Sequence, residues 1–247
     1  MNDYINDLTT RMANGNYAEG EIEIKGQYES HKTVSAKAHN EARALSDATL
    51  IPGLFDDIIA ERDHNNKRDL YFILKHIAIN TKNKDATIFL LERLDAEKDR
   101  FVLVTMLSGL AELYKPEDLN LAPILKCVES KNWHIRGKAY EAVTNSTYDV
   151  ESLLTARLQI AQNNDDIRYL LTALKYVATE KSIHVTEHYL KHKQAAVANA
   201  ATYTLAIILL RARINIDEVH KKTGISVEGL TELAARLPLL TRPPLKL

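Results

Sequence analysis

Residues 164–178 have the sequence NDDIRYLLTALKYVA. A short polar turn leads into a pattern in which Leu171, Leu174 and Ala178 follow Arg168 at offsets of three, six and ten residues. These offsets fall on one face of a helix with about 3.6 residues per turn. The segment therefore predicts an amphipathic helix that begins after a polar turn and buries one apolar face.

The same pattern recurs along the chain, in segments 65–78, 98–111, 132–145 and 194–208. The five reference positions are Arg68, Arg100, Arg136, Arg168 and Ala198, separated by 32, 36, 32 and 30 residues. Another predicted helix precedes each of them, at 49–62, 85–97, 119–130, 150–162 and 182–192. A repeated pair of helices at this period is the unit of an α-solenoid, because one pair cannot bury its apolar stripe alone.

The turn Asn164–Arg168 with Leu171 and Leu174 after it resembles the turn and second helix of a HEAT repeat. Asn132–Arg136, followed by Ala139 and Ala142, resembles it as well. The resemblance covers residues 47–211 and implies an all-α, right-handed superhelix of about five helix pairs. The sequence departs from the pattern at Lys67 and Asp99, where an apolar residue is usual, and at Ala198, where arginine is usual. HEAT arrays have many functions, so the resemblance implies a fold and no activity.

The two ends differ from the middle, as the caps of a solenoid do. Residues 1–46 are expected to form a helical N-terminal cap, with Val34, Ala38, Ala42 and Leu45 in an apolar stripe. Within that cap, 21–25 alternates with a period of two and predicts a short extended stretch. Residues 212–247 are expected to form a helical C-terminal cap with a loose tail at 241–247.

Within the C-terminal cap, 216–233 also resembles a DNA-binding helix-turn-helix with Gly224 at the turn. Glu228 and Glu232 lie on the helix that would read the DNA, where they would repel phosphate. We therefore interpret this segment as a two-helix cap.

Composition narrows the function classes. The chain carries 32 Lys+Arg against 33 Asp+Glu, a net charge of -1, whereas nucleic-acid binders usually carry a basic excess.

One cysteine allows no internal disulfide, and the first residues, MNDYINDLTTRM, lack the basic and apolar regions of a secretory signal. We therefore expect a cytoplasmic protein. The apolar run at 205–210 is too short to span a membrane. The sequence has no glycine-rich phosphate loop, and no cofactor is expected.

The motif His184-Val-Thr-Glu187-His188 matches the H-x-x-E-H pattern of one class of zinc proteases. His192 continues the spacing, so the three histidines are candidates for a metal site. Helical projection places them opposite the apolar side, so we expect an exposed polar face and no catalytic residue here. Cys127 lies in an apolar stripe and is expected to act as a small hydrophobe.

Trp133 is the only tryptophan and lies in a turn beside His134. We expect its side chain to fill the gap between neighbouring repeats, since tryptophan usually buries most of its area. The alternative is an exposed aromatic anchor for a partner.

In HEAT arrays the second helices usually line the concave surface. The predicted partner-binding residues on that surface are Asp69, Phe72, His76, Phe101, Tyr140, Glu141, Tyr169, Tyr176 and Tyr203. This set is rich in aromatic residues, which are enriched at protein interfaces, and contains no lysine or arginine. The sequence thus predicts a non-catalytic scaffold or adaptor that holds a protein or peptide, with Asp69 and Glu141 contacting basic groups of the partner.

One alternative belongs to another function class: a HEAT-like DNA-binding protein or a glycosylase-like enzyme. HEAT-like alkylpurine DNA glycosylases are α-solenoids of similar size that use aromatic residues, an acid and a basic concave surface. This chain departs from them because it has no tryptophan–aspartate pair and no basic excess. A toxin-neutralising immunity protein is a special case of the scaffold, and no residue selects it.

Overall fold

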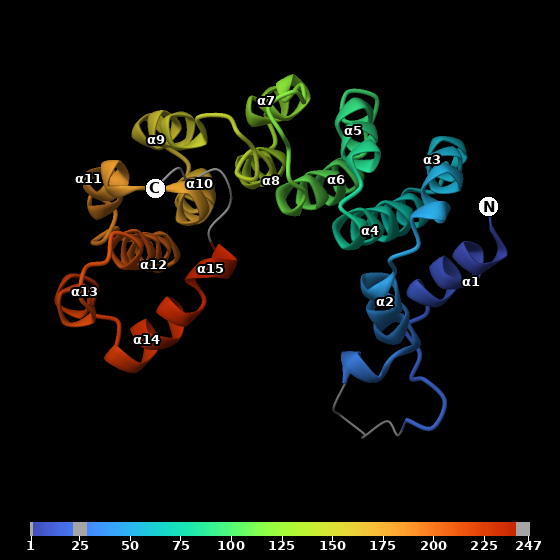
Figure 1. The fold of residues 1–247 in the computed structure, drawn as a ribbon, viewed down its shortest axis with the longest axis horizontal. Helices are drawn as coiled ribbons and strands as arrows, with labels where there is room; N and C mark the ends of the chain where they lie inside the picture. Colours follow the sequence, from blue (N-terminus) through green and yellow to red (C-terminus); the bar gives the residue numbers. More distant parts are fainter. Residues whose placement is uncertain (1, 22–28, 241–247) are drawn as a thin grey trace. The chain divides into compact units, whose positions relative to one another are not determined.

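The computed structural model describes residues 2–21 and 29–240 (Figure 1). Regular structure in these ranges is helical and includes no strand, which confirms the predicted all-α class. The extended stretch expected at 21–25 falls, except for Glu21, outside the described residues, and so does the tail 241–247. No helix in the described ranges combines the length and hydrophobicity that a membrane span requires.

The chain divides into two compact units, residues 1–113 and 114–247. This division lies inside the predicted array 47–211, between its second and third helix pairs. The helices of the first unit are α1 (Asp3–Met12), η1 (Ser30–Lys32), α2 (Val34–Ala44), η2 (Ala48–Leu50), α3 (Ile51–Ala60), α4 (His64–Thr81), α5 (Lys84–Arg93) and α6 (Arg100–Glu112).

Helix α4 is the centre of the first unit, where it packs against α2, α3, α5 and α6 (Figure 1). Its side chains Leu70, Tyr71 and Leu74 are buried, as the repeat pattern predicted for positions 71 and 74. Burial raises the pKa of the Tyr71 hydroxyl to about 12. Helix α2 buries Ala38 and Ala42 of the predicted N-terminal stripe and packs on α4, so α1 and α2 belong to this unit.

The second unit repeats the arrangement around α10, which packs against α8, α9 and α12. In Figure 1, α7, α9 and α11 lie on one side of this unit and α8, α10 and α12 lie on the other. Its helices are α7 (Ala122–Val128), α8 (Trp133–Ala142), α9 (Val150–Ile160), α10 (Asn164–Val177), η3 (Glu180–Ser182), α11 (Ile183–Glu187), α12 (Ala195–Arg211), α13 (Ile216–Thr223), α14 (Val227–Ala235) and α15 (Leu237–Leu240).

The polar residues of the turns start the helices. A side-chain oxygen accepts a hydrogen bond from a free backbone N–H in the first turn of most of them, which satisfies a donor that the helix itself leaves unpaired. The residues that cap helices in this way include Asp63, Asn83, Asp99, Asn132, Asp149, Asn163, Asn215 and Ser226. Asp99, where a HEAT repeat usually has an apolar residue, therefore has a structural role as the cap of α6.

Helices α13 and α14 form a pair that packs on α12. Gly224 ends α13 with a φ of 71°, a left-handed conformation that glycine adopts without a steric penalty. Val219 and Leu230 are buried against Leu205 and Leu209 of α12. The apolar residues of the pair therefore cover one side of α12 and close the core of the second unit at this end.

An ion pair links consecutive second helices in this unit. The Arg136 side chain of α8 donates to Asp166 in the first turn of α10, with Nε–Oδ1 at 3.0 Å and Nη2–Oδ2 at 2.5 Å. Arg136 Nη1 also donates to the carbonyl oxygens of Ser130 and Lys131. The hydrogen bonds to Asp166 hold the pKa of the guanidinium above its usual value. Arg136 thus ties the turn before α8 to the start of α10.

Replacing Asp166 by alanine should lower the free energy of unfolding by about 1–3 kcal/mol, because Arg136 would stay mostly buried without its carboxylate. The matched control is Asp165→Ala, in the same first turn of α10. Asp165 is exposed and contacts Arg168 at 3.4 Å, so its loss should change stability by less than about 0.5 kcal/mol. Urea denaturation followed by circular dichroism measures both, and equal effects would contradict a structural role for the Arg136–Asp166 pair.

Candidate functional site

An aromatic cluster lies where α8 meets α10. We call Trp133, His134 and Tyr169, with Lys138 and Arg168 beside them, the α8–α10 cluster. The Trp133 ring stacks on His134 at a centroid distance of 5.2 Å and lies 6.0 Å from the Tyr169 ring. Trp133 is 39% exposed, so its side chain lies partly against the next repeat and leaves a substantial part of its surface open.

Ile135, two residues later, is the apolar side chain of this turn that is buried. Trp133 is the first residue of α8, and its indole remains at the surface. The large, amphipathic ring is therefore available to a ligand.

A glycine sets the position of Tyr169. A β-carbon at Gly137 of α8 would lie 2.5 Å from Cδ2 and 2.6 Å from Cγ of the Tyr169 ring. The ring therefore occupies the space that a side chain at position 137 would need. Because α8 has no side chain there, Tyr169 of α10 packs directly on its backbone and stays half-buried.

Cations surround the rings of this face. Arg168 Cζ lies 4.7 Å from the Tyr169 ring centroid, and Lys138 Nζ lies 5.7 Å from it. Two turns along α10, Lys175 Nζ lies 4.7 Å from the ring of Tyr176, which is half-buried. Lysine and arginine have long aliphatic stems, so cations from neighbouring positions reach over the aromatic residues. The sequence predicted an aromatic face without lysine or arginine. That prediction is wrong, because basic side chains from neighbouring positions lie beside the aromatic rings.

Tyr140 does not belong to that face. Its side chain is 4% exposed and lies near Arg136, one helical turn earlier. Residues four apart lie on the same side of a helix, so Tyr140 follows Arg136 toward Asp166 and the interior. Burial raises the pKa of its hydroxyl. The prediction of Tyr140 as a surface contact is therefore corrected.

Glu141 and Tyr203 complete the predicted residues of the second unit. Glu141 is half-buried and forms an ion pair of 2.9 Å with Lys138, so its charge is already compensated within α8. Tyr203 of α12 is 55% exposed. Of the predicted aromatic residues of this unit, the structure thus leaves Tyr169, Tyr176 and Tyr203 at least partly exposed.

In the first unit, Phe72 of α4 is at the centre of a second aromatic group. The His39 and His76 rings meet it edge-on, at centroid distances of 5.1 Å and 4.5 Å. Arg43 and Lys75 lie 5.4 Å and 5.2 Å from the Phe72 centroid. Phe72 and His76, both predicted site residues, are therefore brought together and are half-buried.

The other predicted residues of the first unit are Phe101 and Asp69. Phe101 is 46% exposed, with Arg100 and Arg68 at 4.5 Å and 6.0 Å from its ring centroid. Asp69 is half-buried, and burial raises the pKa of its carboxyl, while His39 and Arg68 act in the opposite direction. Each predicted aromatic residue of this unit again lies beside arginine or lysine.

The three candidate metal-binding histidines do not lie on one continuous helix. Helix α11 ends at Glu187, so His188 and His192 lie in the turns that follow it. His184 and His188 are exposed. Within the described residues, no group of three His, Cys, Asp or Glu side chains is arranged to hold a metal ion. Cys127, the other residue considered for chemistry, is half-buried in α7.

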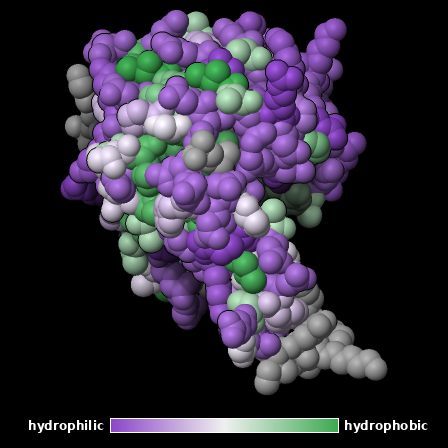
Figure 2. Space-filling view, turned by 90° about the vertical axis from the view of Figure 1, so that its right-hand side faces the viewer, coloured by the Kyte–Doolittle hydropathy of each residue, from purple (hydrophilic) through white to green (hydrophobic). Residues whose placement is uncertain are grey.

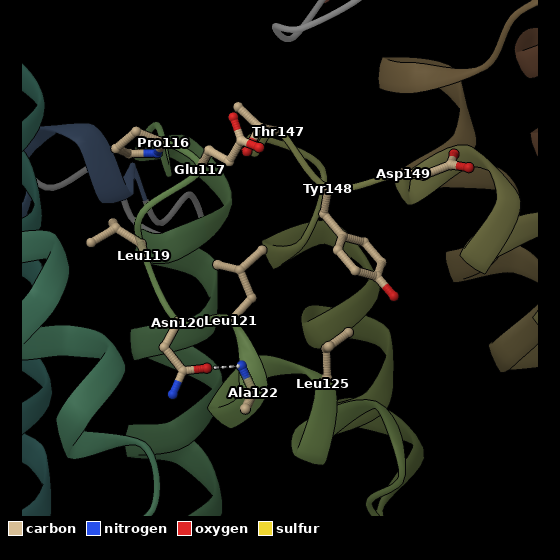
Figure 3. A pocket seen from close by; sticks show the side chains of 10 residues that line it. All are labelled: Pro116, Glu117, Leu119, Asn120, Leu121, Ala122, Leu125, Thr147, Tyr148 and Asp149. Carbon is tan, nitrogen blue, oxygen red and sulfur yellow. Dashed lines mark hydrogen bonds between the residues drawn. The ribbon is translucent and has the colours of Figure 1, made fainter.

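Two open hollows lie elsewhere in the second unit. One, of about 490 Å³, contains Leu121, Leu125 and Tyr148, with Glu117 and Asp149 at its edges (Figure 3). Both carboxylates are exposed, and Asp149 already caps α9. This is unlike the enclosed surroundings in which proteins tune catalytic acids.

The second hollow, of about 480 Å³, is lined by Arg136, Tyr140 and Asp166 together with Arg157 and the exposed Ile160. Its central charges are engaged in the Arg136–Asp166 pair.

On the face drawn in Figure 2, hydrophilic residues predominate and hydrophobic ones form small separate patches. The carboxylates of the first hollow are exposed and the central charges of the second are paired, so the α8–α10 cluster is the stronger candidate site.

Comparison with known proteins gives no assignment: no family model matches the chain, and no curated protein gives a significant match. The functional argument therefore depends on the residues of the site.

Gly137→Ala should destabilise the protein by about 1–3 kcal/mol, because the new β-carbon collides with the Tyr169 ring. The matched control is Gly53→Ala in α3, where nothing lies within 4 Å and alanine should stabilise by up to about 1 kcal/mol. Adding Tyr169→Ala to Gly137→Ala removes the collision. Thermal unfolding of the wild type, Gly137→Ala, Tyr169→Ala and the double variant measures the coupling, and purely additive effects would contradict this packing.

His76 should make the first unit less stable in acid. Burial, followed by the charge of Lys75, lowers its pKa from 6.5 to about 4, and its Nε2 is buried without a partner. The unfolded chain therefore binds the proton more readily, and the free energy of unfolding falls as pH decreases from 6.5 to about 4. His76→Leu should reduce that fall in urea titrations carried out across this pH range. A His76→Leu protein with the wild-type pH dependence would contradict the assignment.

Proposed function

We propose that the protein is a non-catalytic scaffold that binds a protein or peptide partner through the aromatic face of its second helices. The α8–α10 cluster is the observation that carries the proposal. Trp, Tyr and Arg are the residues most enriched among those that dominate binding energy at protein interfaces. Here Trp133, Tyr169 and Arg168 occur together, and Trp133 is 39% exposed.

Rigidity also supports the proposal. Trp133 begins a helix whose start is fixed by Asn132 and Arg136, and Tyr169 rests on the backbone at Gly137. Side chains held in place before binding lose little conformational entropy when a partner docks. This cluster therefore meets two requirements of a recognition site, an aromatic anchor and preorganisation.

We further propose that the helix pairs of each unit are HEAT-like repeats. The evidence is the packing of α4 on α6, of α8 on α10 and of α10 on α12, at the spacing that the sequence repeats. Handedness of a superhelix and cytoplasmic location remain predictions.

A random-peptide display selection tests the function. Peptides should be enriched on the wild-type chain and should bind a Trp133→Ala/Tyr169→Ala variant at least about tenfold more weakly, as expected for loss of anchor residues. Fluorescence of Trp133, the only tryptophan, reports binding at the site directly.

Tyr148→Ala is the control, since Tyr148 is an exposed tyrosine of the same unit that lines the separate hollow. It should bind the selected peptides as the wild type does. The proposal fails if no peptide is enriched, or if the double variant binds the peptides as tightly as the wild type.

A further inference from the structure

The α8–α10 face presents basic groups that its own carboxylates compensate incompletely. Lys138 pairs with Glu141 at 2.9 Å. Arg168 meets Asp165 only at 3.4 Å, and both side chains are exposed, so this pair is weak. Among the described residues Lys175 is paired with no carboxylate, and its Nζ lies 4.7 Å from the centroid of the Tyr176 ring. A ligand that reaches this face meets positive charge first.

Two rings of the face, Tyr169 and Tyr176, are half-buried and have cations beside them. Tyr169 rests against Gly137, and Arg168 and Lys138 lie over it. Tyr176 is covered by Lys175 in the same way. Binding of single-stranded nucleic acid depends on bases that stack on open aromatic faces. Guanidinium groups held beside such rings are instead well placed to bind carboxylates, which they recognise in a bidentate geometry.

The distribution of charge along the sequence points the same way. Residues 114–247 contain 18 Lys+Arg and 14 Asp+Glu, whereas residues 1–113 contain 14 Lys+Arg and 19 Asp+Glu. The overall charge of -1 therefore conceals a basic second unit and an acidic first unit. An acidic ligand is attracted to the second unit and repelled by the first, which favours docking on the α8–α10 face.

We infer that the partner docks an acidic peptide segment on this face, with its carboxylates at Arg168 and Lys175 and an apolar side chain against Trp133. The inference rests on the proposed function and specifies the chemistry of the partner at the same site. It reverses the prediction of a basic partner, because Glu141 is already paired with Lys138.

The test uses the peptides that the display selection enriches on the wild-type chain. Their charged positions should be mainly Asp and Glu. Arg168→Glu/Lys175→Glu should bind them at least about tenfold more weakly and should prefer versions in which the acidic residues are replaced by lysine. Lys181→Glu/Lys191→Glu, a matched double reversal at exposed lysines of the same unit, should retain the wild-type preference. Circular dichroism of each variant checks that it folds.

The outcomes separate the two proposals. If no peptide is enriched, the scaffold function itself fails. If peptides are enriched but are neutral or basic, or if both charge-reversal variants bind them equally, the function stands and the acidic partner is overturned. Oligothymidylate serves as a competitor and should displace the bound peptides only weakly. If it displaces them at a concentration lower than that of the peptide, the inference is overturned in favour of single-stranded nucleic acid.

Discussion

The structure depends on the burial of each second helix between its neighbours. An isolated helix as short as α10 is marginally stable in water, so its stability comes from packing. Leu170, Leu171 and Leu174 are buried in α10, which lies against α8, α9 and α12. Helix α4 has the corresponding role in the first unit, against α3, α5 and α6. Within each unit, one short helix pair therefore stabilises the next.

Equivalent positions in the repeats have diverged around this shared core. In the second unit, Arg136 pairs with Asp166, the residue two places before the next reference position. The residues at the equivalent sequence positions after Arg68, Arg100 and Arg168 are Lys98, His134 and Ala196, none of which carries a carboxylate. The Arg136 side chain therefore stabilises the packing of α8 on α10. The other three arginines lie beside aromatic rings instead, so the same repeat position contributes to packing in one case and to the surface in the others.

The surface that results combines packed aromatic rings with charges carried on long side chains. Small residues in the core determine how closely two second helices approach, and Gly137 lets the Tyr169 ring lie on α8 itself. Around it, the flexible stems of Lys138 and Arg168 bring charge over the aromatic group. A rigid base with adaptable charged groups suits recognition of an extended segment, where side chains must match a partner that orders as it binds.

The sequence determined the helices, because apolar spacing and polar caps act over a few residues. It therefore predicted α4, α6, α8, α10 and α12 close to their observed bounds, and it singled out Tyr169 and Phe101. It could not place Tyr140, Trp133 or the cations, since their environment depends on the rotation of each helix against its neighbours. A shift of one residue turns a side chain by about 100°, from surface to core. Tertiary packing alone decided which aromatic residues stay exposed and which charges surround them.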